Sequence, residues 1–262
     1  MNVQMQFVIQ TVLLPLALSI GVKQFYTSKS QYLFAWLFAA WLIPYSWIIG
    51  VIPVLPKEAI EWPALLGLSF IAIHFVSKPS AFYTNVVNIA FVFSGIVILA
   101  WPVIVRTLQA QLIFELLFFT ATAAIISSRL LKVQPASPAL VLGISNAGLA
   151  VVSALGGSLI IGQVAGSLAA MLSVFALYEL FKKLMSSQVD NKTILLIASL
   201  NLFLLVVARI YAEIPLVPTV LLAVSLIVGL TLKWRFAAGF SLLSVISSVS
   251  WILLTTDDTS YF

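Results

Sequence analysis

Glu115 is the residue of this sequence whose type is most at odds with its surroundings. It lies in an apolar stretch, residues 111–119, and a carboxylate in hydrocarbon costs several kcal/mol unless it is paired, hydrated or protonated. Acidic side chains at such depth often carry a proton or a cation, so Glu115 is a candidate for an ion or substrate pathway. The structural alternative is that Glu115 reaches interfacial water or bonds to Gln111, one helical turn earlier.

Four asparagines also fall inside apolar stretches, namely Asn85, Asn88, Asn146 and Asn201. Asn85 and Asn88 are three residues apart, so on a helix both amides face the same neighbour. A carboxamide inside a membrane either joins two helices, for about 1 kcal/mol, or lines a polar path. Both interpretations stay open, and we treat the four asparagines, with Glu115, as candidates for a substrate or ion pathway.

The remaining reactive residues are too few for a catalytic or metal centre. The chain has no cysteine and one histidine, His74, which excludes thiolate nucleophiles, iron–sulfur clusters and bis-histidine haem ligation within the chain. Neither close acidic pair, Glu58 with Glu61 or Asp257 with Asp258, has a histidine beside it. We expect no cofactor, no metal and no enzymatic activity. An intramembrane enzyme acting on lipid or isoprenoid substrates is the weaker alternative.

These candidates must be positioned by membrane-spanning helices, because the composition excludes a water-soluble fold. The chain is 62% hydrophobic and 8% charged, with a mean hydropathy of +1.16, whereas soluble domains carry about 25% charged residues. The lipid bilayer is therefore the expected partner. The basic residues occur singly or in pairs between apolar stretches, so no nucleic-acid partner is expected.

Ten apolar segments, separated by Pro, Gly, Ser and charged residues, predict an all-α, polytopic bundle of about ten transmembrane helices. At about 20 residues a span, they use most of the 262 residues and leave a single integral membrane domain, 1–262. A division into two five-span halves, 1–132 and 133–262, is a further hypothesis. The predicted spans are 6–22, 31–54, 62–77, 81–105, 109–128, 138–161, 163–182, 193–212, 216–232 and 236–254.

Interruptions recur at corresponding positions of the two halves. Pro15 interrupts the first span, and glycines interrupt the sixth. Interrupted helices in two related halves often mark the binding site of a secondary transporter. The pattern therefore favours transport, although Gly and Pro are frequent in membrane helices generally.

The basic residues sort to one side of the predicted bundle. Loops that stay in the cytoplasm are enriched in Lys and Arg. Of the 13 basic residues, only Lys57, Arg106 and Arg209 fall at even-numbered loops. Odd-numbered loops are therefore predicted to be cytoplasmic, and both chain ends to lie on the non-cytoplasmic side. The residues at odd-numbered loops are Lys23, Lys29, Lys78, Arg129, Lys132, Lys182, Lys183, Lys192, Lys233 and Arg235.

Small residues predict a close contact between the sixth and seventh spans. Small side chains let two helix backbones approach and gain dispersion contacts that lipid does not replace. A groove lined by backbone, which would take a substrate, is the alternative. The residues assigned to helix packing are Gly143, Ala147, Gly157, Gly162, Gly166, Ala170 and Ser173.

The second span is rich in aromatic residues. We expect a lipid-facing helix with its rings near the headgroups, and a stacking surface for a flat ligand is the alternative. The residues concerned are Tyr32, Trp36, Trp41, Tyr45 and Trp47.

Two local ion pairs are predicted from spacing along a helix. Arg209 and Glu213 are four residues apart at one helix end, and Glu179 precedes Lys182 and Lys183 at another. Opposite charges three or four residues apart face each other on a helix.

Two functional hypotheses follow. The first is a small-solute secondary transporter or permease, favoured by the many short spans, Glu115, the asparagines and the interrupted helices. The second is a non-catalytic structural or assembly subunit of a larger membrane protein complex, or a homo-oligomer, favoured by the scarcity of charge inside the spans. The short loops favour a bacterial inner membrane.

Overall fold

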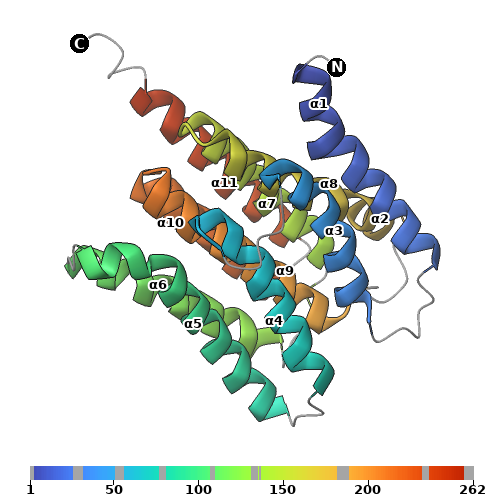
Figure 1. Ribbon diagram of the computed structural model, residues 1–262, viewed down its shortest axis with the longest axis horizontal. Coiled ribbons are helices and arrows are strands. Elements are labelled where there is room, and N and C mark those ends of the chain that lie inside the picture. Colours follow the sequence, from blue (N-terminus) through green and yellow to red (C-terminus); the bar gives the residue numbers. More distant parts are fainter. Residues whose placement is uncertain are drawn as a thin grey trace.

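The computed structural model describes residues 3–25, 32–50, 56–76, 81–106, 110–130, 135, 137–181, 189–231 and 236–256, and within these ranges the regular secondary structure is entirely helical. The helices pack side by side into one bundle (Figure 1). They are α1 (Val3–Val8), η1 (Ile9–Leu13), α2 (Leu14–Phe25), α3 (Leu33–Ile49), η2 (Ala59–Glu61), α4 (Trp62–Val76), α5 (Ala81–Arg106), α6 (Ala110–Leu130), α7 (Pro138–Leu155), α8 (Leu159–Phe181), α9 (Asn191–Tyr211), α10 (Leu216–Thr231) and α11 (Ala237–Thr256).

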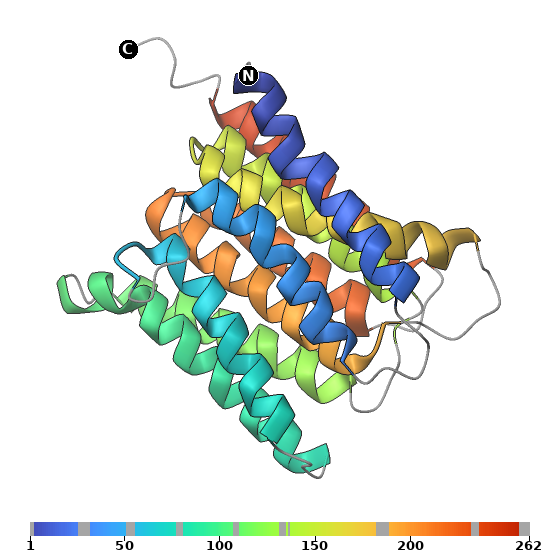
Figure 2. The same ribbon diagram turned by 45° about the vertical axis from the view of Figure 1, so that its right-hand side comes forward.

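Seven helical segments of the described chain are long and apolar enough to cross a membrane. They are the continuous rod formed by α1, η1 and α2, together with α5, α6, α7, α8, α9 and α11. Three further apolar helices are shorter, at 33–49, 59–75 and 216–231. The predicted class, a multi-pass helical membrane protein, is therefore confirmed. Figures 1 and 2 show that α1 begins and α11 ends at the same end of the bundle.

Helix α9 forms the centre of the bundle. Every residue from Thr193 to Ala208 is buried, and α9 contacts α3, α4, α5, α6, α7, α8 and α10. A helix that is apolar around its whole circumference is buried by its neighbours. A polar side chain of α9 between Thr193 and Ala208 therefore lies in the interior of the protein.

Helices α7 and α8 form a tight antiparallel hairpin. A Cβ atom added at Gly162 would lie 2.9 Å from the carbonyl oxygen of Ala150, so the two backbones are in contact there. Gly157 lies in the turn after α7 with φ +93°, a conformation that favours glycine, and Ala147 is exposed on α7. Gly162 thus serves the helix contact, as predicted, whereas Ala147 does not, and Gly157 serves a turn because α7 ends at Leu155 instead of at the predicted 161.

Pro15 explains the irregular first helix. Proline has no N–H to donate to the carbonyl of Thr11, and its ring clashes with that carbonyl. The helix accommodates this with a π-helical turn, η1, which packs on α8. The predicted counterpart in the other half, α7, is a regular α-helix from Pro138 to Leu155.

The aromatic residues of α3 do not all face outward. Trp36 and Trp47 are 62% and 46% exposed, as expected for a lipid-facing surface. Trp41 and Tyr45 are instead buried, where the Trp41 Nε1–H donates to Ser167 Oγ (3.1 Å) and the Tyr45 hydroxyl donates to the carbonyl of Ile60 (2.6 Å). The prediction was wrong for these two residues, because each ring has found a polar partner inside the bundle.

Candidate functional site: a buried ion pair in a pocket

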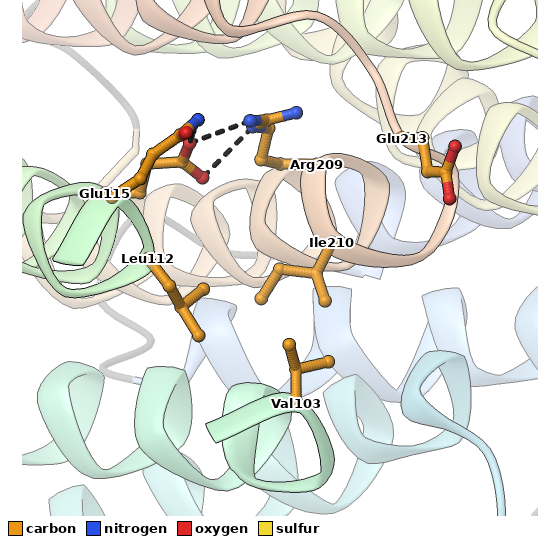
Figure 3. A pocket seen from close by; sticks show the side chains of 7 residues that line it. Val103, Leu112, Glu115, Arg209, Ile210 and Glu213 are labelled. Carbon is orange, nitrogen blue, oxygen red and sulfur yellow. Dashed lines mark hydrogen bonds and ion pairs between the residues drawn. The ribbon is translucent and has the colours of Figure 1, made fainter. Parts of the chain in front are cut away.

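Glu115 is paired with an arginine from the central helix. The Arg209 Nε–H donates to Glu115 Oε2 (3.0 Å), and Arg209 Nη2 donates to Glu115 Oε1 (2.8 Å). The two side chains are 9% (Glu115) and 18% (Arg209) exposed. Two parallel charge-assisted hydrogen bonds hold the planar groups in one geometry and are stronger than bonds between neutral groups. The pair thereby joins α6 to α9 (Figure 3).

Two further hydrogen bonds hold this pair in place. The Gln111 amide donates to Glu115 Oε1 (2.9 Å), as the sequence suggested, and Arg209 Nη1 donates to the carbonyl of Ile214 (2.8 Å). Glu115 therefore accepts three hydrogen bonds. A guanidinium carries five N–H groups, so Arg209 retains two donors beyond these three bonds. Both members of the pair are thus held by additional hydrogen bonds, and Arg209 still has donors for another acceptor.

The predicted local pair between Arg209 and Glu213 was wrong. Helix α9 ends at Tyr211, and Glu213 has a left-handed backbone with φ +52°. Four-residue spacing brings side chains together only while the helix continues. Figure 3 shows Arg209 turned toward Glu115, while Glu213 lies beyond the end of the helix.

An open pocket of about 230 Å³ surrounds the ion pair. Two carboxyl groups, one guanidinium and one carboxamide line this pocket, together with apolar side chains. A second open pocket, of about 430 Å³, lies at the same end of α9 and includes Lys57, Glu58 and Tyr211. The residues lining the first pocket are Val103, Gln111, Leu112, Glu115, Arg209, Ile210 and Glu213.

The four candidate asparagines lie outside this pocket. Asn85 and Asn88 are on α5, Asn146 is on α7 and Asn201 is on α9. Asn88, Asn146 and Asn201 are all buried, with exposed fractions of 2%, 0% and 1%. Asn88 faces His74 of α4. The structure therefore separates the ionic candidate, Glu115, from the neutral ones.

Glu179 has a role that the sequence did not indicate. Its two carboxylate oxygens accept the backbone N–H groups of Ala139 and Leu140, both at 3.2 Å. These N–H groups have no partner within α7, because they belong to its first turn. Glu179 of α8 thus caps α7. The predicted partners, Lys182 and Lys183, lie outside the described residues.

The other reactive residues serve local structure. His74 stacks on Phe70 at 4.0 Å between ring centroids, and its Nδ1 lies 2.9 Å from the carbonyl oxygen of Phe70. Glu58 and Glu61 form a capping box at the start of η2. Asp257 and Asp258 lie outside the described residues. Within the described residues, no group of three or more His, Cys, Asp or Glu side chains is placed to hold a metal ion.

Comparison of the chain with protein-family models, with curated proteins and with solved structures finds no match. The functional interpretation therefore depends on the geometry of its own side chains. The most specific feature is a bidentate ion pair inside a helical membrane bundle, beside an open pocket.

Proposed function

We propose that this protein is a secondary transporter for a small solute, in a bacterial inner membrane. The observation that carries the proposal is the Glu115–Arg209 pair, because ionisable residues inside membrane helices are costly and commonly belong to solute or ion pathways. The pair borders an open pocket of about 230 Å³. No enzymatic step is part of the proposal.

The proposal includes ten spans, with both chain ends on the non-cytoplasmic side. The three shorter apolar helices, at 33–49, 59–75 and 216–231, would then cross as well. At 1.5 Å per residue they measure about 25 Å, slightly less than the hydrocarbon thickness of about 30 Å. A small mismatch of this kind is accommodated by local thinning of the bilayer. Sorting of the basic residues toward odd-numbered loops supports the orientation.

The ion pair supplies a means of coupling. A proton or cation that neutralises Glu115 removes the charge that holds the Arg209 guanidinium, because the two parallel hydrogen bonds depend on an ionised carboxylate. Arg209 is then released from α6, and the contact between α6 and α9 loosens at the pocket. A binding event at the pocket is thereby linked to movement of the central helix.

Glu115→Gln tests this mechanism, because glutamine keeps the size and one acceptor oxygen but lacks the charge. Purified protein in liposomes, given an inward proton gradient, is expected to accumulate at least one solute from a panel of sugars, amino acids and amines. The Glu115→Gln variant should lose the dependence on the gradient, whereas Glu115→Asp should keep part of it. Equal coupling in the wild type and Glu115→Gln would remove Glu115 from the mechanism. Absence of any solute movement would overturn the transporter proposal.

A structural or assembly subunit is the second candidate, and one observation favours it. Glu115 is matched by three donors, as expected for a fixed clamp between α6 and α9. A buried polar pair can specify how helices assemble without taking part in transport. Purification in mild detergent separates the candidates, because a subunit should retain a stoichiometric partner protein, whereas an autonomous transporter should not.

A further inference from the structure

The pocket around the ion pair presents hydrogen-bond donors that the described chain does not use. The Arg209 side chain lines this pocket and is 18% exposed. Its Nη1 atom donates one N–H to the carbonyl of Ile214, and its Nη2 atom donates one to Glu115. Each terminal nitrogen of a guanidinium carries two N–H groups, so one N–H remains on each of these two atoms. Donors arranged on a planar cation in this way are suited to a carboxylate.

The same pocket contains a carboxylate that is not part of the ion pair. Glu213 lines the pocket and is exposed. The one ion pair between described residues joins Arg209 to Glu115, so no described cation is paired with Glu213. In Figure 3 the Arg209 side chain lies between the two carboxylates. Glu213 is therefore able to accept hydrogen bonds from an ammonium group in the pocket.

The charges of the pocket do not balance. Glu115 and Arg209 offset one another, whereas Glu213 adds one negative charge. An anionic solute would reach the remaining donors of Arg209 but would be repelled by two carboxylates. A cationic solute would reach Glu213 but would leave those donors unused. A zwitterion meets both requirements, because its carboxylate accepts from the guanidinium and its ammonium donates to Glu213.

The rest of the pocket wall is mainly aliphatic and leaves room for a small molecule. Val103 of α5, Leu112 of α6 and Ile210 of α9 lie beside the charged groups (Figure 3). The volume of about 230 Å³ is below the range of about 300–1,000 Å³ that is usual for drug-sized ligands. An apolar group gains free energy against such a wall, whereas a polar group without a partner would lose it.

The position of the pocket suits the capture of an external solute. Val103 is near the end of α5, Gln111 is near the start of α6, and Arg209 is near the end of α9. The pocket therefore lies at one end of the bundle. In the proposed orientation this end is non-cytoplasmic, so the open pocket faces the medium from which an importer takes its solute.

We infer that this pocket binds a small zwitterion with an aliphatic body, that is, an aliphatic amino acid, as the transported solute. The inference rests on the proposed transport function and names its substrate class. The carboxylate of the solute accepts the remaining N–H groups of Arg209, and its ammonium group donates to Glu213. Its aliphatic side chain contacts Val103, Leu112 and Ile210.

The second pocket at this end of α9 matches such a solute less well. Its charged residues, Lys57 and Glu58, are consecutive in the chain and exposed, and Glu58 belongs to the capping box of η2. The two charges thus come from one short segment, whereas Arg209 and Glu115 are fixed to each other from two helices. Lys57 therefore supplies a control position for the experiment.

Isothermal titration calorimetry on the purified protein in detergent tests the site without requiring transport. The ligands are glycine, alanine, valine and leucine, each compared with the amine that lacks its carboxyl group and the acid that lacks its amino group. We expect at least one amino acid to bind about tenfold more tightly than either analogue, because each analogue loses one charge-assisted contact. Binding of none of the amino acids, or equal binding of the amine or the acid, would overturn the zwitterion class.

Glu213 offers a matched pair of variants. Asparagine and aspartate are nearly equal in size and both tolerate the left-handed backbone of this position, but only Glu213→Asp keeps the charge. Glu213→Asn should bind the amino acid about tenfold more weakly than Glu213→Asp, and Lys57→Gln should bind it as the wild type does. Equal affinities of the two Glu213 variants, or an equal loss in Lys57→Gln, would overturn the site.

Binding and uptake fail separately. Uptake of another solute by a protein that binds none of the amino acids rejects this substrate class alone. Binding of an amino acid without uptake of any solute rejects the transport function and leaves the binding site in place.

Discussion

Two buried polar regions of the bundle differ in how far their side chains are hydrogen-bonded. At the junction of α6 and α9, Glu115 accepts three hydrogen bonds, and Arg209 donates three. Elsewhere on α9, Asn201 has no hydrogen-bond partner in the described structure at either amide atom. The carboxylate of Glu115 is thus matched within the protein, while the carboxamide of Asn201 is left without a partner in the described structure.

The difference follows from the cost of burial. An unpaired charge inside a protein costs far more than an unpaired amide, so a bundle that is to remain folded must match Glu115 before it matches Asn201. An unpaired amide costs about 1–3 kcal/mol, which a folded bundle can tolerate. The contrast therefore separates a polar pair that joins two helices from a buried amide that makes no hydrogen bond in the described structure.

The largest expected effect on the free energy of unfolding follows from the removal of one partner of the ion pair. Glu115→Leu leaves the Arg209 guanidinium without its carboxylate, and breaking a buried pair in this way destabilises a protein by about 3 kcal/mol. The free energy of unfolding, measured by denaturant titration in micelles, should fall by that amount. Arg209→Leu should produce a similar loss.

The double variant is the control for this prediction. Glu115→Leu with Arg209→Leu removes both charges, and replacement of a buried pair by apolar residues is often neutral or stabilising. The double variant should therefore be more stable than either single variant. Additive losses would show that the two residues act separately and would contradict the matched-charge interpretation.

A smaller effect of opposite sign is expected at the unpaired amide. Asn201→Leu replaces a carboxamide by an apolar side chain of similar size and removes its desolvation penalty, so stability should rise by about 1 kcal/mol. Thermal unfolding of the purified protein provides the measurement, with Ser199→Ala as a control because the Ser199 hydroxyl already donates to Leu195. A loss of stability in Asn201→Leu would mean that the amide is paired in the protein and would remove the contrast between the two regions.

The helical membrane class could be predicted from the sequence because it depends on local composition and periodicity. Apolar stretches of suitable length fix helix positions to within a few residues, as α6 (Ala110–Leu130) shows against the predicted 109–128. The boundary of the sixth span was less predictable, because the turn at Gly157 is set by a positive φ angle rather than by polarity. Local physics therefore indicates where helices lie more reliably than where they stop.

The arrangement of the site could not be predicted in the same way. Glu115 was identifiable as a buried acid, and its bond to Gln111 follows from their spacing on one helix. Its main partner, Arg209, is 94 residues away in the chain, and only the packing of α6 on α9 brings them together. Glu179 presents the same difficulty, because the N–H groups that it caps belong to a different helix.

The smallest expected effect concerns Glu213 and sharpens the assignment of Arg209 to Glu115. Glu213 is exposed and adopts a left-handed backbone, which asparagine tolerates better than most residues. Glu213→Asn should therefore change the free energy of unfolding by no more than about 0.5 kcal/mol, the usual range for an exposed position. A double-mutant cycle between Glu213→Asn and Arg209→Leu should give a coupling energy near zero, whereas the cycle between Glu115→Leu and Arg209→Leu should give a large one. A large coupling to Glu213 would mean that Arg209 exchanges between two carboxylates and would contradict its assignment to Glu115 alone.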